Sequence, residues 1–218
     1  MFTISPTALD YGGDSRRGGR LRLSRGWHLV VVDFSICSPD TRGEQDSKRV
    51  VMAMYDSKAV ANYFLAKGGD ITQMKLHKLI YYAHGWHLAL TDKPLINESV
   101  EAWEYGPVVP AVYHEFKDLG SKNITRRARE FEFAGDGKFT IRAPAIGSND
   151  ERTKKILDRI WEVYGGLTAI QLSQMTHEQD SPWTETRKRN PGMKGVDIPT
   201  DLIKQYFKGR LQANKNVR

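Results

Sequence analysis

The sequence predicts a mainly α-helical protein, in which a compact helical domain surrounds one buried central helix and carries one small β-hairpin. Residues 72–90 are apolar at helical spacing on nearly every side, as expected of a helix covered by other elements. Several further segments repeat apolar residues every three or four positions between capping residues and glycines. Only residues 124–146 change to a period of two, which is the pattern of strands.

The central helix, residues 72–90, has two neighbouring apolar stripes. They contain the side chains that we expect to organise the core: Leu76, Leu79, Ile80, Tyr82 and Trp86. Lys75 and Lys78 form the polar strip, and we expect their alkyl stems to lie along the helix with both ammonium groups in water.

Three histidines in this helix also have the residue type and spacing of metal ligands. His77, His84 and His87 lie seven and three residues apart, so at least two can share a face. No Asp, Glu or Cys lies between Thr72 and Leu90 to complete a zinc site. A core or surface role is therefore favoured, no metal or cofactor is expected, and a His-dependent metal enzyme stays an alternative.

The elements on either side of the central helix have recognisable ends. A first helix is expected over residues 57–67, because Asp56 or Ser57 can cap its start and Gly68-Gly69 ends it. After the central helix, a short extended piece is expected to stop at Gly106-Pro107. The next helix begins at Pro110, because proline suits a first helical turn.

The second half of the chain begins with the expected hairpin, whose turn is Gly135-Asp136-Gly137. A helix over residues 149–164 follows, and Thr168 with Gln171 forms a capping box for the next helix. Ser181 and Pro182 start another helix, and a final amphipathic helix is expected over residues 198–211.

We expect three regions in the chain. Residues 1–51 form an irregular extension in which Trp27–Ile36 could add one strand, and Met52 or Met54 could be the native start. Residues 52–211 form the helical domain, and residues 212–218 form a basic disordered tail.

The composition is that of an ordinary globular protein, with 39% hydrophobic and 27% charged residues in 218. A single cysteine, Cys37, fits a reducing compartment, and no apolar run is long enough to span a membrane. We therefore expect a cytoplasmic protein with no membrane contact.

The formal net charge of +7 is concentrated at the C-terminal end, because residues 187–218 contain nine Lys or Arg and two Asp. Such a segment can attract phosphates, which makes a nucleic-acid-binding regulator an alternative function. Residues 168–188 could also be a helix-turn-helix, but the turn from Thr176 to Ser181 is longer than the usual three or four residues. A solvated terminal helix is the favoured interpretation.

Four separated blocks resemble one family, the Panacea antitoxin domain family, which includes SocA-like and phage-associated GepA-like proteins. They are KLHKLIYYAHGWHLAL, EAWEYGPVVPAVYHEFKDLG, ILDRIWEVYGGLTAIQLSQMTHEQDSPWTETR and IPTDLIKQYF, in this order between residues 55 and 211. The resemblance implies an antitoxin that neutralises a neighbouring-gene toxin by protein–protein binding. It also implies two outcomes for the toxin, which are masking and delivery to a Clp-type protease.

Two loops are candidates for the partner-binding surface. The first contains aromatic and rigid residues between helices: Trp103, Tyr105, Gly106, Pro107 and Pro110. The second contains His177 and Trp183. In both loops the aromatic residues could equally close the core. No nucleophile-elbow, phosphate-loop or zinc-protease motif is present, so a binding protein is favoured over an enzyme.

Overall fold

The computed structural model describes residues 54–134 and 138–216 of the chain. The expectations for residues 1–51, including the strand at Trp27–Ile36, lie outside the described residues, as does the turn at residues 135–137.

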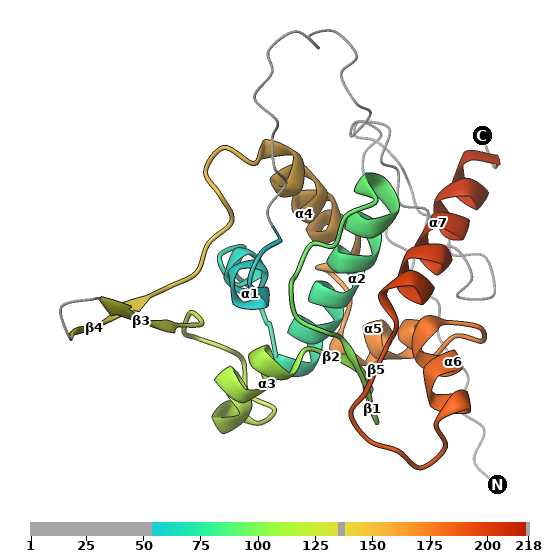
Figure 1. Ribbon diagram of the computed structural model, residues 1–218, viewed down its shortest axis with the longest axis horizontal. Coiled ribbons are helices and arrows are strands. Elements are labelled where there is room, and N and C mark those ends of the chain that lie inside the picture. The colour runs from blue at the N-terminus through green and yellow to red at the C-terminus, as the bar shows by residue number, and fades with distance from the viewer. Residues whose placement is uncertain (1–53, 135–137, 217–218) are drawn as a thin grey trace, which may run out of the picture. The chain divides into compact units, whose positions relative to one another are not determined.

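The predicted mainly α-helical class with a small hairpin is confirmed (Figure 1). The helices are α1 (Ser57–Leu65), α2 (Gln73–Thr91), α3 (Pro110–Phe116), α4 (Glu151–Tyr164), α5 (Ala169–Thr176), α6 (Pro182–Arg189) and α7 (Thr200–Asn216), with a 3-10 turn at Lys117–Leu119. The strands are β1 (Glu101–Trp103), β2 (Gly106–Val108), β3 (Glu130–Ala134), β4 (Lys138–Arg142) and β5 (Val196–Asp197).

Helix α2 lies among the other helices and is packed against α4, α5 and α7 (Figure 1). Its side chains Leu76, Leu79, Ile80 and Trp86 are completely buried, and Tyr82 is nearly so. The Tyr82 ring stacks on Tyr164 with ring centres 4.4 Å apart, and the indole N–H of Trp86 donates to the Tyr164 hydroxyl at 3.0 Å. Burial of such large rings makes α2 the centre of the core.

Gly85 allows α7 to approach the backbone of α2. A Cβ at this position would overlap the ring of Phe207, which is completely buried. The same ring lies edge-on to Trp86, with ring centres 5.2 Å apart. A glycine in the middle of a helix lowers its intrinsic stability, so the gain here is the close packing of the two helices.

The expected exposure of Lys78 is wrong, because this side chain is only 1% exposed. Lys75, in contrast, is partly exposed, and its ammonium group donates to the carbonyl of Gly165 at 2.6 Å. Lys78 lies three residues further along the helix, where β2 covers it and its ammonium group donates to the carbonyl of Pro107 at 3.2 Å.

The expected extended piece does not stop at Gly106-Pro107, because these residues belong to a second strand. β1 pairs antiparallel with β2, and Trp103 is opposite Gly106. β5, almost a hundred residues later, pairs with the other edge of β1. Strands of two or three residues are too short for a period-two pattern to predict them.

The final helix differs from the expectation at both ends. It begins at Thr200, two residues after Ile198, and it continues to Asn216, so the expected irregular tail is wrong for residues 212–216. The sequence after Leu211 contains Gln, Ala and Lys, which favour helix, and no Gly or Pro that would end it.

The remaining local signals match the structure. Asp56 and Ser181 cap helices through their side chains as expected, and the capping box at Thr168 and Gln171 has both of its hydrogen bonds. Thr72 and Asp150, which were not predicted as caps, also cap helices. Strands β3 and β4 pair in the expected hairpin. Within residues 54–134 and 138–216, none of the helices combines the length and the apolar character that a membrane span needs.

Candidate partner-binding site

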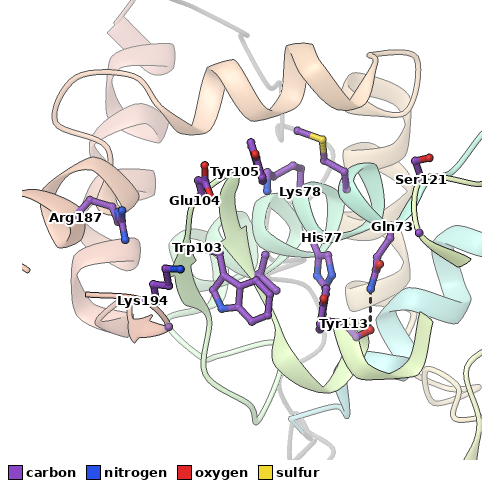
Figure 2. Close-up of a pocket in the computed structure, with 14 residues that line it drawn as sticks. Gln73, His77, Lys78, Trp103, Glu104, Tyr105, Tyr113, Ser121, Arg187 and Lys194 are labelled. Carbon is purple, nitrogen blue, oxygen red and sulfur yellow. Dashed lines mark hydrogen bonds between the residues drawn. The ribbon is translucent and has the colours of Figure 1, made fainter. Parts of the chain in front are cut away.

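A pocket of about 1030 Å³ opens between α2, the β1–β2 hairpin, α3 and α6. Figure 2 shows Gln73, His77 and Lys78 of α2 beside Trp103 and Tyr105. Arg187 of α6 and Lys194 of the following loop lie on the opposite side of the pocket from Gln73 and Ser121 (Figure 2). The pocket therefore combines aromatic walls with basic side chains.

The two aromatic residues of the first candidate loop have different surroundings. The Trp103 indole N–H donates to Glu101 at 2.7 Å, and its ring lies 4.7 Å from that of Tyr113, centre to centre. Tyr105 is held through its carbonyl, which accepts from the Ser173 hydroxyl at 2.9 Å, while the residue is 66% exposed. Trp103 is thus a fixed wall and Tyr105 an exposed rim.

Lys78 is the buried basic residue of the pocket. Among the described residues, no Asp or Glu forms an ion pair with it, and burial alone lowers its pKa to about 7. Gly106 makes room for it, since a Cβ there would lie 2.7 Å from Lys78 Cε and 2.8 Å from both Lys78 Nζ and Thr176 Oγ1. Gly106 also has φ of +106°, a region that glycine adopts most readily.

His77 is a second buried polar group that borders the pocket. The backbone N–H of Val109 donates to Nδ1 of His77 at 3.4 Å, which places the proton of the neutral ring on Nε2. Nε2 has no hydrogen-bond partner among the described residues. Burial, with a smaller contribution from Lys78, lowers the pKa of His77 to about 3, so the ring is neutral at pH 7.

The two candidate loops lie side by side in the structure. Residues of the first loop line the pocket, whereas His177 and Trp183 of the second loop pack behind it. The Trp183 indole N–H donates to the carbonyl of Trp103 at 2.8 Å, and the ring of His177 lies 3.9 Å from that of Trp183, centre to centre. Both are half-buried behind β1 and do not line the pocket. Pro107 is buried and Pro110 starts α3.

A second surface lies on the β3–β4 hairpin, which projects from the helices in Figure 1. Four apolar side chains on one face of the hairpin are 60–74% exposed: Phe131, Phe133, Phe139 and Ile141. We call them the hairpin face. The opposite face is polar, and there Arg142 lies 3.7 Å from Glu130 and 3.6 Å from Glu132.

Asn62 of α1 holds the base of this hairpin. Its Nδ2 donates to the carbonyls of Ala128 at 3.1 Å and Pro144 at 2.9 Å, and its Oδ1 accepts from the N–H of Ala128 at 2.8 Å. These two residues flank β3 and β4, so one buried side chain fixes both ends of the hairpin. The hairpin face is therefore attached at a defined point.

Lys78 and Asn62 are the two positions that sequence reasoning missed. Lys78 lies three and four positions before Tyr81 and Tyr82, both buried, so helical spacing places it in an apolar stripe. Asn62 lies three positions after Ala59 on the buried side of α1. A polar residue inside an apolar stripe is the signal that would have indicated both.

The basic residues of α7 are largely paired within the chain. Lys204 lies 2.9 Å from Asp92, Lys208 pairs with the same carboxylate, and Arg210 pairs with Glu178. In α6, Lys188 lies 3.0 Å from Glu185. These basic side chains therefore do not form a free basic surface. Asp92 and Glu178 lie far from α7 in the sequence, whereas Glu185 is only three residues from Lys188.

The histidines of α2 do not form a metal site with other described residues. Within the described residues, no group of three or more His, Cys, Asp or Glu side chains is placed to hold a metal ion. His87 instead has its Nδ1 2.8 Å from the carbonyl of Lys93, and Nδ1 of His84 has no partner in the described part of the chain.

Comparison with known proteins places this architecture in a family. The family model described as Antitoxin SocA-like, Panacea domain, matches residues 76–184, which run from α2 into α6. Antitoxin SocA of Caulobacter vibrioides (strain NA1000 / CB15N) is 32% identical over 160 residues, which are 70% of this chain and 82% of that protein. The chain therefore belongs to the SocA-like antitoxin family with a Panacea domain. No solved structure matches it.

Proposed function

We propose that this protein is a cytoplasmic antitoxin that neutralises the toxin of a neighbouring gene by direct protein–protein binding, without catalysis of its own. Its membership of the SocA-like antitoxin family supports the antitoxin role. The two surfaces described above support binding as the mechanism, and both lie within or next to the segment that the family model matches.

The observation that carries this proposal is the hairpin face. Single exposed apolar residues are common on proteins, but four large ones on one face form a patch of the kind found at protein interfaces. Phe133 and Phe139 are cross-strand neighbours whose ring centres lie 5.3 Å apart. Because Asn62 fixes the base of the hairpin, less conformational freedom is lost when a partner covers the face.

Co-expression with the product of the neighbouring gene tests the proposal. The wild-type protein should restore growth and retain the toxin in a pull-down. Replacement of Phe133 and Phe139 by Thr, which keeps β propensity, should weaken the complex at least tenfold and reduce rescue. The control is Glu132→Thr, on the polar face of the same hairpin, and it should leave both unchanged. Rescue without any complex would contradict direct binding.

Two mechanisms follow binding, and we favour masking of the toxin because it needs only one interface. Delivery to a Clp-type protease needs a second contact. The basic side chains of α7 are the nearest candidates for such a contact, but Lys204, Lys208 and Arg210 are engaged with Asp92 and Glu178. They are therefore less available to a second partner.

The half-life of the toxin in cells separates the two mechanisms. Masking predicts that the half-life does not shorten when the antitoxin is present, whether or not the protease gene is deleted. A half-life that shortens with the antitoxin and recovers on deletion of the protease gene would establish delivery instead.

A further inference from the structure

The pocket contains a buried positive charge that no carboxylate in the described part of the chain neutralises. Lys78 donates to the carbonyl of Pro107 at 3.2 Å, which leaves two of the three ammonium hydrogens for other acceptors. Arg187 and Lys194 also line the pocket, against the single carboxylate of Glu104. The pocket is therefore suited to a negatively charged group.

The walls of the pocket indicate what should accompany that charge. Trp103, Tyr105 and Tyr113 line it together with Met74 and Val108. Aromatic side chains bind apolar groups with little ordering cost, and a flexible thioether adapts to the shape of such groups. Both also exclude water from a charge pair beside them. A ligand with one negative group next to an apolar side chain would match both parts.

We propose that this pocket binds a carboxylate of the toxin, presented by an extended acidic segment, while a neighbouring apolar residue of that segment packs against Trp103 and Tyr105. This inference rests on the proposed function, since it names the chemistry by which the partner is recognised. The hairpin face and the pocket would then be two parts of the toxin-binding surface.

A carboxylate fits the donors at the pocket. Lys78 offers ammonium hydrogens, and His77 carries its proton on the unpaired Nε2. A carboxylate has two acceptor oxygens and one charge, which matches one buried cation. Pairing would also remove the cost of the isolated buried charge, whose pKa is now about 7.

A protein segment fits the size and openness of the pocket. Its volume of about 1030 Å³ is at the upper end of the roughly 300–1,000 Å³ of small-molecule sites. Tyr105 on its rim is 66% exposed, as expected where a chain would enter and leave. Trp and Tyr, the aromatic residue types that line this pocket, are enriched in interface hot spots.

A matched pair of small probes tests the chemistry without the toxin. N-acetylphenylalanine carries a carboxylate beside an aromatic ring, and N-acetylphenylalaninamide replaces the carboxylate by a neutral amide. NMR titration of the full chain should shift the Trp103 indole N–H with the acid, and the amide should bind at least tenfold more weakly. Equal binding of both probes, or binding of neither, would overturn the proposal.

Substitutions then connect the pocket to the toxin. Lys78→Met keeps an unbranched apolar stem but removes the ammonium group, so it should remove the preference for the acid and weaken toxin binding at least tenfold. Lys75→Met is the control, because Lys75 lies on the same helix, donates to the carbonyl of Gly165 and does not line the pocket. Gly106→Ala, which crowds Lys78, is a second variant and should weaken binding in the same direction.

The outcomes separate this inference from the proposed function. If the wild-type chain binds the toxin and Lys78→Met binds it equally well while still folded, the carboxylate site is wrong and the antitoxin function stands. If the wild-type chain does not bind the toxin, the proposed function fails and the assignment of a toxin carboxylate fails with it.

Discussion

Lys78 carries its ammonium group inside the protein, and no carboxylate of residues 54–134 or 138–216 pairs with it. Burial lowers its pKa from 10.5 to about 7. Between these values the unfolded chain binds one more proton than the folded chain, so the free energy of unfolding rises with pH. For this one group the slope is at most about 1.4 kcal/mol per pH unit. Below pH 7 the folded protein bears the full cost of the buried charge.

Lys78→Met should therefore stabilise the protein at pH 7, by about 1–3 kcal/mol, because an apolar side chain replaces an unpaired buried charge. The advantage over wild type should narrow between pH 7 and pH 9, where the folded wild type loses the proton. Urea denaturation at both pH values measures this difference. A variant that is less stable at pH 7 would show that Lys78 has a structural role.

The buried histidines of α2 should make the free energy of unfolding decrease at acidic pH. Burial lowers the pKa of His77 to about 3 and that of His84 to about 4, and it also lowers the pKa of His87. In the unfolded chain these rings take up protons below about pH 6.5.

The free energy of unfolding should fall as the pH drops from 6.5 towards 4, by up to about 1.4 kcal/mol per unit for each buried ring. Guanidinium denaturation at pH 6.5 and 4.5 measures the loss. His84→Gln, which cannot titrate, should lose less than wild type over this range. An identical loss would mean that His84 takes up its proton in the folded state.

At the scale of elements, α7 packs closely against α2 at Gly85, where the Phe207 ring lies against the α2 backbone. Gly85→Ala should destabilise the protein by about 1–3 kcal/mol, although alanine is the better helix former, because its Cβ would overlap the Phe207 ring. Gly209→Ala in α7 is the control, since a Cβ there meets nothing within 4 Å. Gly209→Ala should raise the midpoint temperature of thermal unfolding, whereas Gly85→Ala should lower it. If the midpoint rises for both variants, α7 can move away from α2 to make room for the Cβ.

The β3–β4 hairpin depends on a single buried amide. Asn62→Ala would leave two carbonyls and one N–H without their partner, at a cost of about 1–3 kcal/mol for each buried group that water cannot reach. Hydrogen exchange of the β3 and β4 amides should become faster while α2 stays protected. Asn123→Ala, at an exposed hydrogen bond to Asp70, should not change the hairpin. Unchanged hairpin exchange in Asn62→Ala would show that other contacts hold it.

Elements with local signals could be predicted from the sequence, and elements that depend on distant contacts could not. The predicted caps at Asp56, Thr168 and Ser181 are set by residues within three positions. The pairing of β5 with β1 is long-range, and each strand is too short to show alternation. The exposure of the hairpin face could not be predicted either. An apolar face in a sequence predicts burial, and the sequence does not show whether the covering surface belongs to this chain or to a partner.

For the whole molecule, only some of the predicted partner-binding residues line the pocket, and their role in binding stays a prediction. Trp103 and Tyr105 line the pocket, whereas His177 and Trp183 stand behind β1 as support. Lys78 was assigned to water because a lysine side chain usually reaches it, and only the return of the chain at Pro107 encloses this one. The division of the chain at residue 52 stays a prediction, since the described residues begin at Met54.

Titration of the purified toxin with the purified antitoxin, in an assay of the toxin's own activity, tests direct neutralisation most closely. If the antitoxin neutralises by direct binding, inhibition rises linearly with added antitoxin and saturates at a fixed ratio, with no protease or other factor present. The variant with Thr at both Phe133 and Phe139 should need a large excess. A toxin that stays fully active in excess wild-type antitoxin, although co-expression restores growth, would contradict neutralisation by binding.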